Sequence, residues 1–557
     1  MQVVETPKAN PESLLAIVQG AYQGKVVIPE FQRSFIWPRD AIEELLVSIL
    51  QGYFIGTFLI LDTQPDKSLF PFRVVEGLEK VNGHARPENH ATIRLILDGQ
   101  QRLTSLFYVL YEPPIPLRFT SYPYRFFFRV DLALDEDPSD AIVSVSRGDR
   151  RRLAEVEQLI GQHRAIPFST LADADRFFEW FYHEQRFLET ERDKAIIKAF
   201  RERFYQFMVP VVALSPDTGK ANIVNIFERI NSSGVSLSLF DLAVARLYLK
   251  GIKLRHLWDD FRKADKGATQ AVQPEAVLKV IALLEGKETK RASLLDILDA
   301  LDHDRFLGRW NAATRYLSEA YKRATSAPGG YGAVGPDWIP YTTMLVPLAA
   351  LLHRIDECKG GEDMYRKLDR WYWASVFSQK YDHAVDSGTY ADVRDVGGWF
   401  EDGDPPAWLA SMSPDVIDPD VDERRSAVYK GLMCLVVLKG ARDFCTGQAV
   451  PLHECEDDHI FPRAKFKRHA RVNSILNRTL IYKECNRSKT DKLPSEYLPI
   501  LEASHGGRRE RLQETLSTHF IPDDGLLAMQ RDNLDAFLQA RRSEFLAEIR
   551  RRIGGSG

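Results

Sequence analysis

The first hundred residues alternate between helical and strand-like patterns of hydrophobic positions. Apolar residues at 42, 45, 46, 49 and 50 follow the i, i+3, i+4 spacing of an amphipathic helix that begins near Pro38. Two apolar runs of strand length follow, at 53–61 and 92–97. The second run leads through Asp98-Gly99 into another helical pattern that continues to Leu110. This alternation of strand, tight turn and helix predicts an α/β domain.

The next part of the chain mixes the two patterns. Residues 122–130 are aromatic and strand-like, whereas 152–161 and 173–209 are typical of charged helices. Residues 222–249 are helical at both ends, around a break at Asn231-Ser232-Ser233-Gly234. These patterns extend the first domain to about residue 250.

Helical patterns predominate in the remainder. Residues 255–400 are mostly helical, and helices are also predicted over 424–439 and 533–553. The acidic, proline-rich stretch between them is the best candidate for a linker. We therefore expect an α+β multidomain chain with four parts: an α/β domain over 1–250, a helical connecting region over 251–400, a linker over 401–423 and a final domain over 424–557.

The composition narrows the class of protein. Of 557 residues, 44% are hydrophobic and 27% are charged, which excludes collagen-like and disordered chains. Five cysteines without close pairs argue against a disulfide framework and favour reduced thiols. The first residues do not form a signal-peptide pattern, and no apolar run is long enough to span a membrane, so we expect a cytoplasmic protein without a membrane partner.

A group of chemically suited residues lies in the final domain. Asp457-Asp458-His459 is followed by Asn477 and by Asn486. At a strand end, the carboxylate of Asp458 suits a hard divalent cation such as Mg²⁺ or Mn²⁺, while His459 can remove a proton from water. A cation held by few protein ligands keeps positions open for water and phosphate oxygens. Asn486 offers a neutral oxygen that completes such a site.

The charge around this group points to a phosphodiester substrate. Residues 459–492 hold ten lysines and arginines against two acids, a local net charge of +8. The whole chain carries −4, so the rest carries −12. The overall charge argues against a globally basic nucleic-acid coat, but a basic segment on an acidic protein is what a local nucleic-acid site requires.

The order Asp-His-Ile-x-Pro, a middle Asn, and Asn-Arg-x-Lys resembles an HNH nuclease whose third histidine is replaced by Asn. It is similar to the HNH domain of the RNA-guided CRISPR effector nuclease and to the one that ends GmrSD-type restriction enzymes. The resemblance implies a ββα-metal fold. It makes His459 the general base, Asp458 and Asn486 the metal ligands, Asn477 the residue that orients the base loop, and Lys489 a phosphate contact. A zinc site involving His453, Cys455 and Cys485 lacks paired ligands, and we do not expect it.

Three polar motifs interrupt the apolar pattern of the first domain, at 28–37, 98–102 and 227–234. The second lies between a strand and a helix, where free backbone N–H groups favour an anion. Gly99 gives the turn its backbone freedom, Asp98 can hold a metal or water, and Arg102 can make a bidentate phosphate contact. The alternative interpretation is a helix cap with a surface arginine.

Together these motifs resemble the N-terminal domain of the same GmrSD-type, modification-dependent (type IV) restriction endonucleases. This family includes SspE-like proteins, and the resemblance implies a domain with a fold similar to ParB and sulfiredoxin. The resemblance implies binding and hydrolysis of a nucleoside triphosphate, GTP above others. The sequence has no Gly-x-x-x-x-Gly-Lys-Ser/Thr motif, so any hydrolysis must use a geometry without the usual phosphate-binding loop. Residues of the second motif map onto the nucleotide site: Asp98, Gly99, Gln100, Gln101 and Arg102. Four more residues either surround the same pocket or read a DNA modification, a choice that stays open: Gln32, Arg33, Arg229 and Asn231.

Other features have simpler interpretations. Arg150-Arg151-Arg152 is expected to be a solvated helix face, and the stripe Trp371, Tyr372, Trp373, Phe377 is expected to be core. Phe31, Phe35 and Trp37 either form an apolar wall around a modified nucleotide or belong to the core.

These observations favour a cytoplasmic, antiphage restriction endonuclease that cuts foreign or modified DNA at a divalent-metal HNH site coupled to NTP hydrolysis. One alternative is an NTP-controlled DNA-binding module without cleavage, and another is an RNA-directed toxin nuclease, because phosphate contacts do not distinguish DNA from RNA. A homodimer is compatible with the sequence. The sequence leaves open which modification is sensed, which NTP is used, and whether one strand or both are cut.

Overall fold

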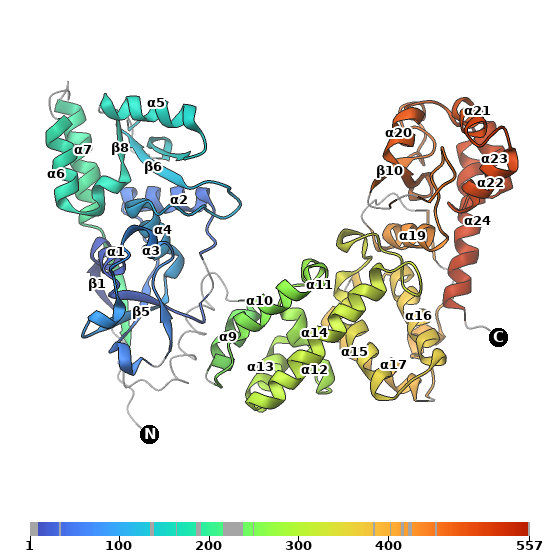
Figure 1. Ribbon diagram of the computed structural model, residues 1–557, viewed down its shortest axis with the longest axis horizontal. Helices are drawn as coiled ribbons and strands as arrows, with labels where there is room; N and C mark the ends of the chain where they lie inside the picture. The colour runs from blue at the N-terminus through green and yellow to red at the C-terminus, as the bar shows by residue number, and fades with distance from the viewer. Residues whose placement is uncertain are drawn as a thin grey trace. The chain divides into compact units, whose positions relative to one another are not determined.

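The computed structural model divides into two compact units, 1–249 and 250–557. Their helices and strands are labelled in Figure 1. The structure describes residues 9–32, 35–68, 70–133, 139–162, 164–184, 191–214, 238–248, 250–382, 385–401, 403–413, 417–420, 426–449, 451 and 454–554.

The first unit is built on a six-stranded mixed sheet with the order β1-β9-β3-β5-β2-β4. β2 runs parallel to β5, and β3 runs parallel to β9, whereas the other neighbours are antiparallel. The strands are β1 (Ala9–Ser13), β2 (Val26–Pro29), β3 (Phe58–Thr63), β4 (Phe72–Arg73), β5 (Ile93–Asp98) and β9 (Met208–Leu214).

A second, antiparallel sheet of the first unit has the order β7-β6-β8, from β6 (Tyr124–Arg129), β7 (Ile142–Ser146) and β8 (Ala165–Pro167). Buried side chains from both sheets and from the helices share one core, in which Ile49, Ile96 and Phe126 are at most 1% exposed. The helices are α1 (Leu14–Tyr22), α2 (Arg39–Gln51), α3 (Leu78–Val81), α4 (Gln100–Tyr111), α5 (Arg150–Gly161), α6 (Ala174–Glu184), α7 (Glu191–Tyr205) and α9 (Leu239–Tyr248). The short 3₁₀ helices are η1 (Pro65–Lys67), η2 (Pro87–Asn89), η3 (Ser139–Ala141) and η4 (Phe168–Ala172).

Local periodicity predicted most of these elements. The helix after Pro38 is confirmed as α2, with its five apolar positions buried, and the strand–turn–helix at 92–110 is confirmed as β5 and α4. The strand predicted over 53–61 is wrong at its start, because β3 begins only at Phe58 and Phe54 is 75% exposed. The helix predicted up to residue 209 is wrong at its end, because Met208 begins β9, which pairs with both β1 and β3.

Among its described residues, the second unit is mainly helical and contains a small two-stranded sheet of β10 (Cys455–His459) and β11 (Arg478–Tyr482). The prediction of a helical region over 255–400 is confirmed. The predicted stripe on α16 is core, since Trp371, Tyr372, Trp373 and Phe377 are all buried. The α-helices are α10 (Leu254–Ala264), α11 (Lys266–Ala271), α12 (Glu275–Leu284), α13 (Arg291–Ala300), α14 (His303–Thr325), α15 (Leu345–Glu357), α16 (Glu362–Phe377), α17 (Val385–Phe400), α18 (Ala407–Ala410), α19 (Ala427–Leu438), α20 (Lys483–Lys489), α21 (Pro494–Ser504), α22 (Arg509–Ser517), α23 (Asp523–Gln530) and α24 (Leu534–Ile553). The 3₁₀ helices are η6 (Pro336–Trp338), η7 (Thr342–Met344), η8 (Lys380–Asp382) and η11 (Ile475–Asn477).

Part of the predicted linker packs against the C-terminal helices. Asp420 accepts hydrogen bonds from Arg471 and Ser474, and Asp418 lies 3.5 Å from Arg542 of α24. The described part of 401–423 is therefore attached to the second unit. Among the helices that the structure describes, none has the combination of length and hydropathy that a membrane span requires.

Candidate active site

Asp458 and His459 end the first strand of a ββα arrangement. β10 pairs antiparallel with β11, so that His459 lies opposite Arg478 and Asp458 lies opposite Thr479. The chain passes directly from Tyr482, the last residue of β11, into α20. The predicted local order of strand, strand and helix is therefore present around these residues.

The alternation of side chains along β10 separates two groups of polar residues. Asp457 and His459 share one face with Arg478, whose Nε donates to Asp457 at 2.8 Å and whose Nη1 lies 2.9 Å from His459 Nε2. The opposite face carries Glu456 and Asp458, which contact α20. The candidate base and the candidate metal ligand therefore project from opposite faces of one strand.

The surroundings of His459 disfavour its charged form. Its pKa is lowered to about 4, mainly by burial and also by the adjacent Arg478 cation, against the raising effect of Asp458. At neutral pH the imidazole therefore has a ring nitrogen without a proton, as a general base requires.

The face covered by α20 supplies oxygen donors. Asn486 Nδ2 donates to Glu456 Oε2 at 3.0 Å, so the Asn486 side chain contacts the β10 face that also carries Asp458, and its amide carbonyl takes no part in this hydrogen bond. The Asp458 side chain is 32% exposed. Carboxylate and amide oxygens are the ligands that Mg²⁺ and Mn²⁺ prefer, so the residues present fit the expected hard cation.

Lys489, at the end of α20, binds inside the unit. Its Nζ lies 3.0 Å from Asp458 Oδ2 and donates to the backbone carbonyl of His459. The side chain is only 3% exposed, and burial lowers the pKa of Lys489. The contact with phosphate expected for Lys489 stays a prediction, and its buried position favours a role in positioning the Asp458-His459 pair.

Asn477 secures the loop that follows β10. It is fully buried at the end of η11. Its Oδ1 accepts from Phe461 N at 2.8 Å, while its Nδ2 donates to Phe461 O at 3.0 Å and to Val472 O at 2.9 Å. Asn477 therefore ties both ends of the 460–476 loop together, directly after His459.

A buried arginine of α24 holds the backbone where η11 passes into β11. Arg541 is fully buried, and its Nη1 donates to the carbonyls of Leu476 and Arg478 at 2.6 Å each. Its Nε donates to His519 O at 3.1 Å. The two carbonyls flank Asn477, so α24 fixes the backbone on both sides of that residue.

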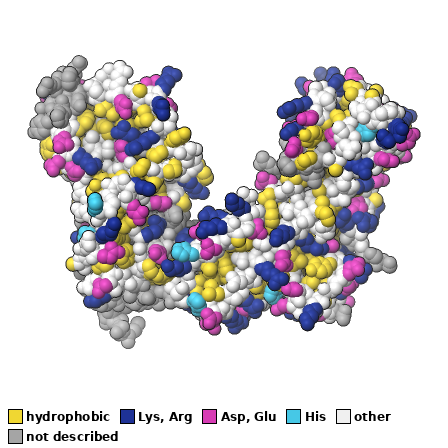
Figure 2. All heavy atoms as spheres, viewed as in Figure 1, with side chains coloured by type: hydrophobic (Ala, Val, Ile, Leu, Met, Phe, Trp, Pro, Cys, Tyr) yellow, Lys and Arg dark blue, Asp and Glu magenta, His cyan; other side chains and the backbone are white. Residues whose placement is uncertain are grey.

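The basic segment separates into two classes of residue. Arg471, Arg478 and Lys489 form ion pairs with acids of the second unit. A set of exposed cations lies on the loop after His459, and we name it the basic loop: Arg463, Lys465, Lys467 and Arg468. Figure 2 shows lysine and arginine side chains interspersed with acidic ones on the surface of this unit. The exposed cations of the basic loop, which can contact nucleic-acid phosphates, therefore lie directly after the candidate base His459 in the sequence.

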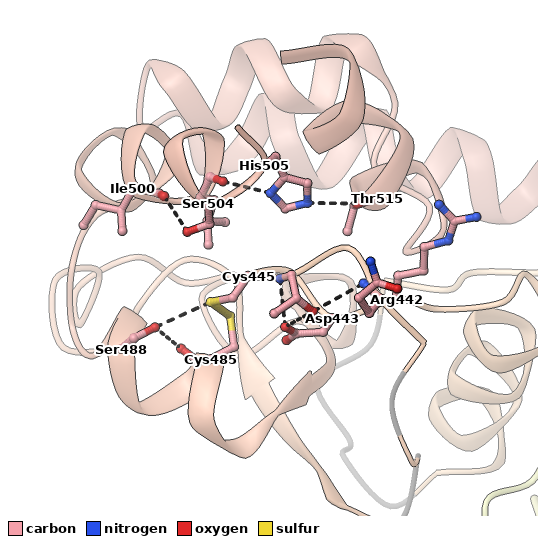
Figure 3. The surroundings of a disulfide bond; sticks show 12 residues. Arg442, Asp443, Cys445, Cys485, Ser488, Ile500, Ser504, His505 and Thr515 are labelled. Carbon is pink, nitrogen blue, oxygen red and sulfur yellow. Dashed lines mark hydrogen bonds between the residues drawn. A yellow bond between two sulfur atoms is a disulfide. The ribbon is translucent and has the colours of Figure 1, made fainter. Parts of the chain in front are cut away.

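Two cysteines, predicted to be reduced thiols, are joined. A disulfide links Cys445, in the turn after α19, to Cys485 of α20, with their Cα atoms 5.6 Å apart (Figure 3). The prediction was wrong for this pair because the residues are 40 positions apart in sequence and only the packing of the turn on α20 brings them together. Cys358, Cys434 and Cys455 are free.

In the first unit, the Asp98-Gly99 turn joins β5 to α4 as predicted. Gly99 has φ +98°, and a Cβ at this position would lie 2.5 Å from the Phe58 ring. Both the backbone conformation and the lack of space therefore require glycine. The turn places Asp98 next to the N-terminus of α4, which is the positive end of the helix dipole.

Arg102 is engaged with neighbouring backbone within the first unit. Its guanidinium donates to Ile55 O at 2.7 Å and to Thr57 O at 2.8 Å, and it lies 3.3 Å from Asp98 Oδ2. Burial lowers the pKa of Arg102. The side chain thus holds the 55–57 loop against the turn, and the bidentate phosphate contact expected of Arg102 stays a prediction.

The first two polar motifs pack together. Gln32 Nε2 donates to the carbonyls of Ile96 and Leu97 at 2.7 Å each, and Gln101 Oε1 accepts from Ile36 N at 3.0 Å. Gln100 is buried. The expected pocket residues Arg33, Arg229 and Asn231 lie outside the described residues.

The aromatic residues around Gln32 have different surroundings. Phe31 is buried and packs edge-to-face on Phe70 with ring centroids 5.1 Å apart. Phe35 and Trp37 are partly buried against the core. Phe31 therefore belongs to the core, and the two partly exposed rings keep the wall interpretation open.

Sequence reasoning missed several residues of the site. Glu456 and Asp457 were present in the motif, and strand alternation would have assigned them to opposite faces. Arg478 was counted only as charge, although its position directly after Asn477 on a second strand predicts a cross-strand neighbour of the Asp-His pair. No local signal identifies Arg541, because its contacts are 63 and 65 positions away.

Comparison with known proteins gives two findings. Residues 14–248 match the model of the GmrSD restriction endonuclease N-terminal domain. The chain is also 29% identical over 600 residues to an uncharacterized protein of Methanocaldococcus jannaschii, with 97% of this chain and 98% of that protein covered. The first finding supports the resemblance of the N-terminal motifs to GmrSD restriction endonucleases, a nuclease family, and the second shows a relative of similar length.

Proposed function

We propose that this chain is a modification-dependent restriction endonuclease that hydrolyses DNA phosphodiesters at its ββα unit. The observation that carries the proposal is the presence of Asp458, His459, Asn477 and Asn486 within one such unit. A protein that only binds DNA has no need for a half-buried histidine of lowered pKa at the same strand end as oxygen ligands for a hard cation. The match of the N-terminal domain to a restriction endonuclease domain supports the same activity.

In the proposed reaction, His459 removes a proton from a water molecule, and the resulting hydroxide attacks the phosphorus atom. Asp458 and Asn486 would hold Mg²⁺ or Mn²⁺, which stabilises negative charge on the phosphate and on the leaving oxygen. Lys489 and Asn477 keep the strand end and its loop in position. The exposed cations of the basic loop bind the phosphates of the substrate.

We further propose that the N-terminal domain binds and hydrolyses a nucleoside triphosphate, with GTP as the first candidate. The positive end of the α4 dipole at Gly99 favours phosphate, and Asp98 offers a carboxylate for a cation or water. Because Arg102 is engaged with the 55–57 loop, we assign the attraction of phosphate to the helix terminus rather than to the Arg102 side chain. Coupled to NTP hydrolysis, the proposed cleavage would destroy foreign, modified DNA in the cytoplasm as an antiphage defence.

One experiment separates these activities. The full-length protein is incubated with unmodified plasmid, phosphorothioate DNA, glucosylated-cytosine DNA and matched RNA, with and without GTP or ATP. We expect cleavage of at least one modified DNA in Mg²⁺ or Mn²⁺, complete loss in EDTA, and phosphate release that falls at least tenfold in Asp98→Ala. Cleavage that persists in EDTA, or cleavage of RNA alone, would refute the proposal. Binding of modified DNA without cleavage would favour a pure binding module.

The basic loop yields a separate prediction for DNA affinity. In a Lys465→Gln/Lys467→Gln/Arg468→Gln variant, we expect weaker binding and a less steep dependence of log K on log salt. Each lost phosphate contact reduces the slope by about 0.9. Binding is measured by fluorescence anisotropy in EDTA over a range of salt concentrations.

The matched control is Arg150→Gln/Arg151→Gln/Arg152→Gln on α5. These arginines are exposed, as predicted for a solvated face, and carry the same total charge. Their removal should leave the salt dependence near that of the wild type. Equal losses in both variants would mean that total charge, and not the basic loop, determines the affinity.

A further inference from the structure

The surroundings of Cys445 and Cys485 contain a third residue with a metal-binding side chain. Asp443, Cys445 and Cys485 place a carboxylate oxygen and two sulfurs within 4.8 Å of one another (Figure 3). Asp443 and Cys485 are buried, whereas Cys445 is half-buried, so the group can be reached from solvent at one side.

The carboxylate of Asp443 supplies an independent sign of a missing ligand. Its Oδ2 accepts hydrogen bonds from the backbone N and from the Oγ1 of Thr446, at 2.9 Å each. Its Oδ1 is also buried, but among the described residues it has no hydrogen-bond partner, and Asp443 is only 3% exposed. A buried anionic oxygen without a donor is costly, and a cation at this position would satisfy it.

We propose that Asp443, Cys445 and Cys485 bind a thiophilic divalent cation of the zinc class when the two cysteines are reduced. Two thiolates and one carboxylate are a ligand set for Zn²⁺, whereas Mg²⁺ prefers oxygen ligands throughout. Three protein ligands leave a fourth tetrahedral position to solvent. The disulfide and the metal site are alternative states of the same pair, because a sulfur bonded to its partner is no longer a thiolate.

The site would connect two separate segments of the second unit. Asp443 and Cys445 lie in the turn after α19, and Cys485 lies in α20. Ser488 Oγ, one turn further along α20, lies 3.6 Å from Cys445 Sγ and can support a thiolate from outside the ligand group. The cation would therefore hold α20 to this turn in the reduced protein, as the disulfide does in the oxidised one.

Cobalt substitution tests this site without any measurement of nuclease activity. The full-length protein is reduced with a phosphine, freed of metal, and titrated anaerobically with Co²⁺ in excess Mg²⁺, which fills oxygen-only sites. We expect one equivalent of Co²⁺ to produce thiolate-to-cobalt charge-transfer absorption, which Zn²⁺ then displaces. Oxidised wild-type protein should give no such band until it is reduced. Because the two samples have the same sequence, the comparison does not depend on whether a substitution disturbs folding.

Variants identify the ligands. Cys445→Ser and Cys485→Ser should each remove or shift the charge-transfer band, and Asp443→Asn should weaken Co²⁺ binding at least tenfold. Cys358→Ser, which removes a thiol outside the group, should match the wild type. The proposal is overturned if the reduced wild type gives no charge-transfer band, or if the band survives in the Cys445→Ser/Cys485→Ser double variant.

Discussion

Replacement of His459 by alanine should reduce the rate of DNA cleavage by about 10²–10⁴-fold, because general-base catalysis contributes this much to hydrolysis. The His459 side chain is half-buried, and its ring nitrogens contact Arg478, which also pairs with Asp457 and so keeps a partner in the variant. DNA affinity in EDTA should therefore change little. Single-turnover cleavage of the preferred modified DNA, followed in Mg²⁺, measures the effect.

His469→Ala is the matched control for this prediction. His469 lies in the same loop region and contacts Asp535 of α24 at 3.1 Å, away from the Asp458-His459 pair. We expect its cleavage rate to remain within about threefold of the wild type. Wild-type activity in His459→Ala would remove this residue from the mechanism, and an equal loss in both variants would indicate damage to the fold.

Replacement of Asn477 by alanine should have the second large effect, on both stability and cleavage. It leaves three backbone groups of Phe461 and Val472 without their buried partner, and each unpaired group costs about 1–3 kcal/mol. We expect the free energy of unfolding of the second unit to fall by at least about 3 kcal/mol, the sum of three such costs at their lower bound. Urea unfolding followed by tryptophan fluorescence measures this change.

The cleavage rate of Asn477→Ala should also fall at least tenfold at temperatures where the variant is still folded, because the loop after His459 is no longer tied at both ends. Asn473→Ala provides the comparison, since Asn473 is exposed in the same loop. Stability equal to that of the wild type in Asn477→Ala would contradict the buried hydrogen-bond network. A stable Asn477→Ala protein with full activity would show that the loop needs no such tie.

Elements with strong local signals could be predicted from the sequence. The apolar spacing in α2 and the strand–glycine–helix order at Gly99 are properties of adjacent residues. The error at 53–57 has a physical cause: the aromatic run resembles a strand, but Tyr53 and Phe54 are exposed and the loop is held by hydrogen bonds to Arg102. Such a contact depends on a residue almost fifty positions away.

The same distinction applies to the candidate site. The spacing of Asp458, His459, Asn477 and Asn486 was readable because a ββα unit is short and contiguous. The sequence also predicted the sign and magnitude of the local charge. It did not predict that Arg478 and Lys489 form ion pairs with acids of the same unit. The disulfide and the support from α24 depend on packing between distant segments, which no local pattern encodes.

The position of Arg541 has a consequence for protein synthesis. A ribosome adds residues from the N-terminus, so the segment with Asn477 and Arg478 is made before the arginine that binds its backbone 63 residues later. During that interval the nascent chain contains the complete Asp458-His459 sequence but lacks the helix that fixes the strand behind it. The proposed catalytic geometry is therefore assembled late in translation, and a chain that stops before α24 carries every proposed catalytic side chain without the support that aligns them.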